Sequence, residues 1–185
     1  MPSDLTLFVR QMLRSPQQVG AVVPSSARLA AAMAAHLGPD TGPVIEFGAG
    51  TGRITRAILD RCVAPRDLTL FEMNPDFVAG LRQRFPGVTV HDAMAQDVVR
   101  LCAPGAGAVV SGLPLLAMRV EIRREILEGA FAVLRAGGTY TQFTYGPHSP
   151  VDDALQSALG LRAEKGRSVW LNLPPARVWR YVRAD

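Results

Sequence analysis

The sequence predicts an α/β fold in which a doubly wound, mostly parallel seven-stranded sheet ends in an antiparallel hairpin, preceded by an N-terminal helical appendage. Two observations carry this prediction. From residue 42 onward, short apolar runs alternate with amphipathic stretches, which is typical of strands and helices in turn. The last two apolar runs are separated by residues 172–175, too few for a helical crossover, so they should pair antiparallel.

The runs interpreted as strands are rich in β-branched and aromatic residues. They cover residues 43–47, 68–71, 88–91, 108–111, 139–145, 168–171 and 176–182. The clearest helices between them cover residues 51–62, 75–85 and 120–134. We interpret residues 136–138, Ala-Gly-Gly, as the stop of the last helix, in which a glycine takes the left-handed conformation.

Two helical segments precede the sheet. The first is predicted to be amphipathic, because its apolar residues fall within one arc at about 100° per residue and its arginines lie opposite. The apolar residues are Leu5, Phe8, Val9, Met12 and Leu13, and the arginines are Arg10 and Arg14. The second segment begins at Ser25 or Ser26, which are natural caps, and runs through residues 27–37 to Gly38-Pro39.

Length and composition favour one domain over residues 1–185, with helices in 1–38 and the sheet in 42–185. A chain of 185 residues with 48% hydrophobic content can bury one sizeable core but is short for two. The start of the sequence does not resemble a secretory signal, which makes the cytoplasm the expected compartment. Cys62 and Cys102 are too few ligands for a metal site, so no metal is expected.

The charge balance is basic and rests on arginine. The formal net charge is +4, and of 20 basic residues only Lys165 is a lysine. Guanidinium groups bind phosphate oxygens bidentately, which suits nucleic acid or anionic lipid. An arginine-rich solvated surface explains the same composition equally well.

A glycine-rich segment follows the first predicted strand and leads into a helix. This segment, called the glycine turn below, consists of Glu46, Phe47, Gly48, Ala49, Gly50, Thr51 and Gly52. Backbone amides at such a turn face the ligand crevice. A nicotinamide fingerprint would have its third glycine at Arg53, and the acidic Glu46 would repel a pyrophosphate. The turn therefore predicts a cationic sulfonium cofactor, S-adenosylmethionine, whose methionine ammonium suits an acidic partner.

Two further acidic residues follow at the ends of the next strands. Glu72, followed by Met73, lies about 20 residues past the last glycine, where a carboxylate accepts both ribose hydroxyls. Asp92, followed by Ala93, comes after the third strand, where an acid can bind the adenine amine. Each acid alone is also typical of a helix cap or a surface charge. Together with Glu46 and with Ser111 after the fourth strand, they predict the cofactor site.

The chain resembles the bacterial phospholipid N-methyltransferases, which are similar to the ribosomal RNA adenine dimethylases. The resemblance covers nearly the whole length and implies a class I, Rossmann-like methyltransferase fold that ends in an antiparallel hairpin. Ala49 stands where a proline is expected in the glycine turn. The segments that carry the resemblance are 19–26, the glycine turn, 111–114, 142–147, 172–176 and 178–179.

The resemblance implies stepwise N-methylation of phosphatidylethanolamine towards phosphatidylcholine by direct in-line displacement. Tyr145 and Tyr140 are the catalytic candidates, since aromatic faces would hold the growing methylammonium. The substrate-binding candidates are Ser25, Ser26, Gly112, Leu113, Pro114, Tyr145 and His148. Ser111 replaces the Asn or Asp that adenine methyltransferases carry, and Leu115 replaces their stacking aromatic, which argues against adenine as acceptor and against a nucleic-acid partner.

The first helix has two interpretations. Its apolar stripe either packs on the sheet domain or enters the lipid interface while Arg10 and Arg14 meet phosphates. The resemblance favours docking on an anionic membrane, so we expect a peripheral protein at the inner face of the cell membrane. The alternatives are methylation of ribosomal RNA adenine or of a small amine, and a noncatalytic cofactor-binding protein at the membrane. The sequence does not determine the oligomeric state.

Overall fold

The computed structural model describes residues 26–145, 148–169 and 175–184. In this part of the chain, seven strands form one sheet in the order β3-β2-β1-β4-β5-β7-β6. The strands are β1 (Val44–Phe47), β2 (Leu68–Glu72), β3 (Thr89–Asp92), β4 (Ala106–Ser111), β5 (Leu134–Thr144), β6 (Leu161–Val169) and β7 (Ala176–Arg183). Strands β1 to β5 are parallel, and β7 pairs antiparallel with both β5 and β6. The predicted fold class is confirmed.

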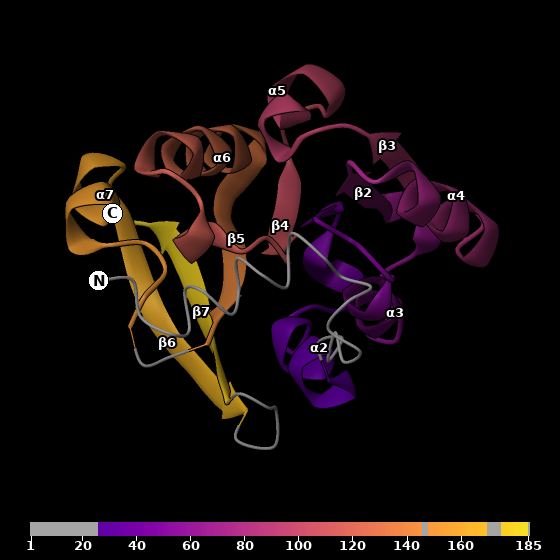
Figure 1. Cartoon of the computed structure of the whole chain (residues 1–185), viewed down its shortest axis with the longest axis horizontal. Coiled ribbons are helices and arrows are strands. Elements are labelled where there is room, and N and C mark those ends of the chain that lie inside the picture. The colour runs from indigo at the N-terminus through magenta and orange to yellow at the C-terminus, as the bar shows by residue number, and fades with distance from the viewer. Residues whose placement is uncertain (1–25, 146–147, 170–174, 185) are drawn as a thin grey trace.

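Helices cover both faces of this sheet (Figure 1). They are α2 (Ala27–Met33), α3 (Arg53–Leu59), α4 (Pro75–Arg84), α5 (Val98–Leu101), α6 (Val120–Val133) and α7 (Asp153–Ala158). Side chains of α2, α3 and α4 pack in one half of the core, and those of α5, α6 and α7 pack in the other. Helices α2, α3 and α4 therefore cover one face of the sheet, and α5, α6 and α7 cover the other.

The strands supply both halves of the core in alternation. Val44 packs with the α2–α4 half and Ile45 with the α5–α7 half, because successive strand residues point to opposite faces. All four residues of β1 are buried, as are all six of β4. Burying one such Val or Ile contributes about 1.5–3 kcal/mol, so the central strands are held rigidly. They provide a fixed base for the loops at their carboxyl ends.

Several helix boundaries differ from the sequence prediction, including the ends of α3 at Leu59 rather than residue 62 and of α4 at Arg84 rather than residue 85. Helix α3 begins at Arg53 because Gly52 before it has a φ of 74°, outside the helical region. Helix α2 is capped by Ser26, whose Oγ accepts from Leu29 N at 3.2 Å, and it ends at Met33 rather than residue 37. Helix α6 ends at Val133, so the predicted stop at 136–138 is wrong. Gly137 is left-handed, with a φ of 71°, but lies inside β5.

The last strands are longer than predicted, and two short helices were missed. β5 begins at Leu134 rather than residue 139, and β6 begins at Leu161 rather than residue 168. The start of β5 pairs with Ala106, where the register shifts towards Ala108, so its pattern is irregular. Helices α5 and α7 have only 4 and 6 residues, too few for periodicity to be visible. The predicted first helix lies outside the described residues.

One edge strand of the sheet is short and the other carries charged residues. β3, at one edge, has four residues. β6, at the other, carries Arg162, Glu164 and Lys165, and its register with β7 shifts between Lys165 and Ser168. Glu164 forms ion pairs with Arg162 and with Arg180 of β7. Among the described helices, none is long and apolar enough to cross a membrane.

Candidate active site

The order of the strands reverses between β1 and β4, and both loops that follow these strands carry predicted site residues. β1 is flanked by β2 on one side and β4 on the other. In such open α/β sheets, ligands bind outside the carboxyl ends of the strands at this reversal. The glycine turn follows β1, and residues 111–114 end β4 and follow it.

The glycine turn is held by backbone hydrogen bonds and needs its glycines. Gly48, Gly50 and Gly52 have φ values of 69°, 51° and 74°. Gly48 N donates to Phe71 O at 2.8 Å, which fixes the turn to β2. A Cβ on Gly48 would lie 2.8 Å from Leu113 Cδ2, so the missing side chain lets the two loops approach each other.

Gly52→Ala is expected to destabilise the fold by about 2–3 kcal/mol. The new Cβ would lie 2.5 Å from Phe85 Cε2 and 2.9 Å from Leu81 Cδ2, and the left-handed φ of 74° adds strain. Urea unfolding measures this loss. The control is Gly80→Ala in the interior of α4, where the nearest atom is 4.0 Å away and alanine should stabilise the helix by up to about 1 kcal/mol. Equal stability of the two variants would contradict the expectation.

Glu46 is a fully buried carboxylic acid on β1. Its Oε2 accepts a hydrogen bond from Thr55 Oγ1 of α3 at 2.7 Å. Its Oε1 is buried without a hydrogen-bond partner among the described residues. Burial raises the pKa of Glu46 to about 8, the hydrogen bonds with Thr55 oppose this rise, and the charge of Glu72 adds to it. An unsatisfied buried oxygen of this kind is suited to a cationic ligand group.

Glu72 organises the end of β2. Its Oε2 accepts from Gly50 N at 2.8 Å, and its Oε1 accepts from Met73 N and Asn74 N, both at 2.9 Å. The carboxylate therefore fixes the glycine turn against the start of α4, where Asn74 is the N-cap. A carboxylate has about four acceptor positions, so one remains on Oε2 for a ligand hydroxyl.

Asp92 lies beside Glu72 at the end of the neighbouring strand, in register with it, and its side chain is exposed. Ala93 N donates to Glu72 O at 3.2 Å.

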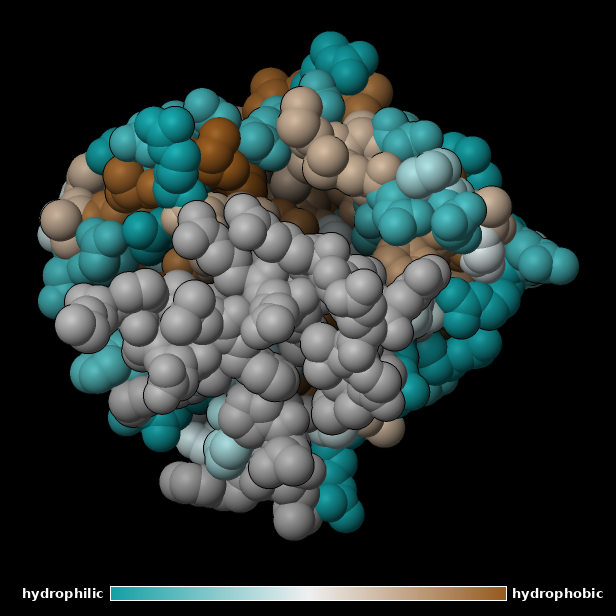
Figure 2. Space-filling view, viewed as in Figure 1, coloured by the Kyte–Doolittle hydropathy of each residue, from teal (hydrophilic) through white to brown (hydrophobic). Residues whose placement is uncertain are grey.

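The two methionines that follow these acids, Met73 and Met94, are 63% and 46% exposed, although apolar side chains of this size are usually covered. Hydrophobic surface is visible near α5 and α6, where Val99 and Val120 are also exposed (Figure 2).

The loop after β4 is fixed by a buried polar network that the sequence analysis missed. Gln142 of β5 is fully buried, and its Nε2 donates to Leu113 O at 2.8 Å. Its Oε1 accepts from Tyr140 Oη at 3.2 Å. On the other side of the loop, Ser111 Oγ accepts from Leu113 N at 3.3 Å, and Gly112 N donates to Phe47 O at 2.8 Å. The available signal was Gln142 itself, an amide side chain within the predicted fifth strand at 139–145.

The two catalytic candidates are separated by the sheet. Tyr140 is fully buried, packs against Phe131 and Tyr181 in the α5–α7 half of the core, and has a pKa raised by burial. These contacts enclose the Tyr140 side chain in the core, which argues against direct contact with a substrate. Tyr145 is half-buried at the end of β5 and meets Phe143 edge-on, with ring centroids 5.3 Å apart. It packs with the α2–α4 half.

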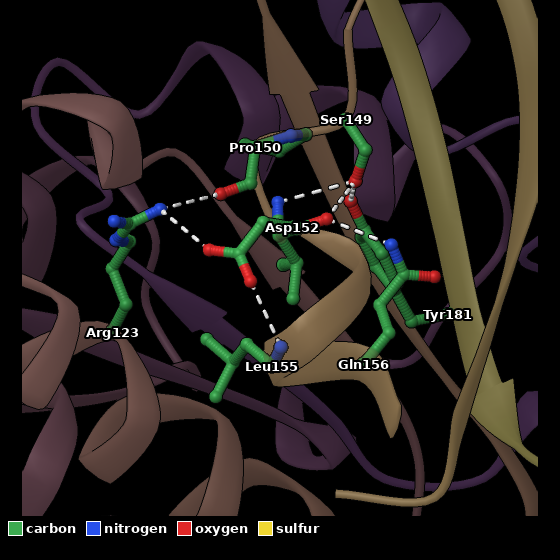
Figure 3. A network of polar contacts seen from close by, with 8 residues as sticks. Arg123, Ser149, Pro150, Asp152, Leu155, Gln156 and Tyr181 are labelled. Atoms are coloured by element: carbon green, nitrogen blue, oxygen red, sulfur yellow. Dashed lines mark hydrogen bonds and ion pairs between the residues drawn. The ribbon is translucent and has the colours of Figure 1, made fainter. Parts of the chain in front are cut away.

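The segment that follows Tyr145 is anchored from 149 onward (Figure 3). Ser149 Oγ lies 2.7 Å from Tyr181 Oη, and Arg123 of α6 donates to Pro150 O at 3.2 Å. Asp152 caps α7 by accepting from Leu155 N at 2.8 Å and lies 3.9 Å from the Arg123 guanidinium. His148, a predicted substrate residue, is exposed just before this anchor. Among the residues that the structure describes, no hydrogen bond or ion pair ties His148 to the loops after β1 and β4.

Among the other predicted substrate-binding residues, Ser26 acts as the N-cap of α2. Ser25 and the predicted membrane residues Leu5, Phe8, Val9, Arg10, Met12 and Arg14 lie outside the described residues. Within the described ranges, no group of three or more His, Cys, Asp or Glu side chains could hold a metal ion.

The residues brought together fit a sulfonium nucleoside. Glu46 has a buried free oxygen for a cation, Glu72 has an open acceptor position for a ribose hydroxyl, and exposed methionines flank Asp92. The positive-φ glycines let the turn approach a ligand closely.

Comparison with known proteins supports this interpretation. Residues 44–138 match the model of the methyltransferase domain family, a span that includes the glycine turn, Glu72, Asp92 and Ser111. The chain is also 31% identical over 152 residues to an ornithine lipid N-methyltransferase of Singulisphaera acidiphila, covering 78% of this chain and 79% of that protein.

Solved structures share the fold at low sequence identity. The 1,6-didemethyltoxoflavin-N1-methyltransferase of Burkholderia thailandensis, with bound S-adenosylhomocysteine, gives a TM-score of 0.74 at 18% identity, covering 97% of this chain and 88% of that one. A TehB-like SAM-dependent methyltransferase of Corynebacterium glutamicum gives 0.64 at 15% identity, covering 96% and 97%. The fold of the described chain is thus that of class I methyltransferases.

Proposed function

The chain belongs to the methyltransferase domain family and uses S-adenosylmethionine, and from this premise we propose that it N-methylates the amine of a lipid headgroup. The proposed acceptors are phosphatidylethanolamine and its mono- and dimethyl forms. The observation that carries the proposal is the 31% identity to a lipid N-methyltransferase across 78% of this chain. Residues 1–185 would act as one domain, peripherally bound at the inner face of the cell membrane.

S-adenosylmethionine supplies an electrophilic methyl group on its sulfonium. The contribution of this chain is to bind and orient the reactants, with Glu46, Glu72 and Asp92 as the acids that would hold the cofactor. The Leu113 side chain occupies the space that a Cβ on Gly48 would need, so the loops after β1 and β4 pack closely. The acceptor amine must be neutral to react, so a desolvated site favours it.

The aromatic side chains of Tyr145 and Phe143 are suited to binding a cationic headgroup. An aromatic face attracts a methylammonium, and the attraction grows when water is excluded. Both side chains are only partly buried at the carboxyl end of β5. Gln142 would act as a positioning residue, since it holds Leu113 O on the acceptor side.

An ornithine lipid is the second candidate acceptor, favoured by the name of the relative. Its amine would accept a methyl group by the same reaction, so one assay tests both lipids. Labelled S-adenosylmethionine is incubated with phosphatidylcholine vesicles that contain phosphatidylethanolamine, ornithine lipid or neither, and with purified ribosomal RNA. Label extracted with phosphatidylethanolamine supports the proposal, and label only with ornithine lipid shifts the acceptor. Label in RNA, or none despite cofactor binding, overturns lipid methylation.

Tyr145→Phe is expected to lower turnover about tenfold while leaving cofactor affinity within about twofold. The change removes one hydroxyl from the proposed acceptor side, and one hydrogen bond contributes about 0.5–1.5 kcal/mol. Steady-state kinetics and calorimetric titration of the cofactor measure the two quantities. The matched control is Tyr181→Phe, which loses the hydroxyl that contacts Ser149 and should lower stability with little effect on turnover. Loss of cofactor affinity in Tyr145→Phe would contradict the assignment.

A further inference from the structure

A groove crosses the outer surface of the layer formed by α2, α3 and the end of α4. Its volume is about 680 Å³. Small side chains from α2, the turn after it and α3 line the groove, and they are Ala27, Ala30, Ala31, Ala35 and Ala57. One end is lined by Thr51 and Gly52, so the groove reaches the glycine turn. It is separate from the acceptor loop at 111–114, none of whose residues line it.

The groove is strongly basic. Arg53, Arg56, Arg61 and Arg84 line it against a single carboxylate, Asp60. Among the described residues, none of these four guanidinium groups forms an ion pair with a carboxylate, although six ion pairs involve arginines elsewhere. An uncompensated cluster of four cations is costly through mutual repulsion, unless an anion occupies the space between them.

Aromatic contacts hold two of the arginines in place. The guanidinium carbons of Arg56 and Arg84 lie 5.2 Å and 5.6 Å from the centroid of the Phe85 ring. Arg61 is tied by its Nε to Leu37 O at 3.0 Å. Three of the four cations are therefore positioned before any ligand arrives, which reduces the entropy lost on binding.

We propose that this groove binds the phosphates of anionic phospholipid headgroups and docks the chain on the membrane. The identification of the occupant as lipid rests on the proposed function. Guanidinium groups bind phosphate oxygens bidentately, and an excess of positive charge over an open groove complements an anionic bilayer. Large exposed apolar side chains such as Met73, Met94 and Leu116 lie elsewhere, so the contact is with headgroups rather than acyl chains.

The groove is less suited to RNA, whose single strands are bound by stacking bases on exposed aromatic rings. Phe85, the aromatic residue that lines it, is 5% exposed and carries arginines on its ring. Docking through this surface places the glycine turn next to the bilayer, because Thr51 and Gly52 line the same groove.

The test uses the full chain, without methyl donor, in flotation with phosphatidylcholine vesicles that contain about 30% phosphatidylglycerol. The variant is Arg53→Gln with Arg56→Gln. Because one arginine near an anionic surface contributes about fivefold in partition, the double variant should bind about 30-fold less. The matched control is Arg119→Gln with Arg124→Gln on α6, which removes the same charge from two exposed, ion-paired arginines and should bind within threefold of the parent.

Weak binding to pure phosphatidylcholine and loss of binding at high salt are also expected. If the double variant does not fold, Arg53→Gln alone should bind about fivefold less. Equal losses in the groove and control variants, or equal binding to neutral and anionic vesicles, overturn the proposal. A groove variant that no longer binds ribosomal RNA but still binds vesicles like the parent also overturns the proposal. Methylation of lipid dispersed in detergent is measured separately, so its failure would count against the proposed function and leave the docking result intact.

Discussion

Replacing Glu72 with alanine is expected to lower the affinity for S-adenosylmethionine at least about 100-fold. The Glu72 carboxylate accepts from Gly50 N, Met73 N and Asn74 N, so its removal frees three amides and loosens Gly50, although Gly48 N still ties the turn to Phe71 O of β2. The one open acceptor position on Oε2, which would receive a ribose hydroxyl, is lost at the same time. A hydrogen bond to a charged group contributes about 1.5–3 kcal/mol, and a tenfold change in affinity corresponds to about 1.4 kcal/mol.

Calorimetric titration of the cofactor measures this loss, with two variants as references. Glu72→Gln keeps one acceptor oxygen but places an amide nitrogen near a donor, so its affinity should lie between those of the parent and the alanine variant. Asp76→Ala removes an exposed carboxylate from the first turn of α4 and should bind within about twofold of the parent. Unchanged affinity in Glu72→Ala would show that the cofactor binds elsewhere.

The buried Glu46 should make the stability of the cofactor-free chain depend on pH. Its pKa is about 8 in the folded chain, against an ordinary value of 4.5. Between these values the folded state holds a proton that the unfolded state has lost, so the free energy of unfolding falls as the pH rises. Since one pKa unit corresponds to about 1.4 kcal/mol, the fall is at most about 5 kcal/mol.

Glu46→Gln should remove this dependence. Relative to the parent, the variant should gain stability from pH 5 to pH 8, the window set by the pKa of Glu46. Urea unfolding at each pH unit measures the free energy of unfolding of the parent and of Glu46→Gln. The control is Glu128→Gln, an exposed position on α6, whose free energy of unfolding should differ from that of the parent by an amount that does not change with pH. Parallel pH profiles for the parent and Glu46→Gln would mean that Glu46 is ionised in the folded chain.

Cofactor binding should couple to the same proton. A cationic ammonium beside the free Oε1 favours the carboxylate, so binding at pH 7 should release about one proton from the parent and none from Glu46→Gln. Calorimetry in two buffers of different ionisation enthalpy counts these protons. The variant keeps the size of the side chain but not its charge, and its cofactor affinity should fall about tenfold or more.

Much of the sheet could be predicted because the central strands are buried on both faces and read as continuous apolar runs. The glycines at 48, 50 and 52 were visible because glycine adopts such positive φ values without the steric cost that other residues pay. The start of β5 was not predicted, because its irregular pairing beside Ala106 depends on a distant strand. The same holds for the anchor between Arg123 and Pro150, which joins segments 27 residues apart.

The separation of the Tyr140 and Tyr145 side chains has a simple geometric origin. Residues of one strand alternate between faces, and Tyr140 is separated from Tyr145 by an odd number of positions, so the two side chains point to opposite sides of the sheet. Only one of them could belong to a given site. The same rule groups Tyr140 with Gln142, which explains why their side chains meet and why Gln142 belongs to the buried network.

The short and charged edges of the sheet have a consequence for how copies of the chain behave together. An exposed strand edge is a template for pairing with another chain. β3 offers only four residues, and β6 presents Arg162, Glu164 and Lys165 beside a register shift. Continuation of the sheet from one copy into the next is thereby disfavoured at both ends. Crowding of many copies on a surface should therefore not seed fibrils through these edges.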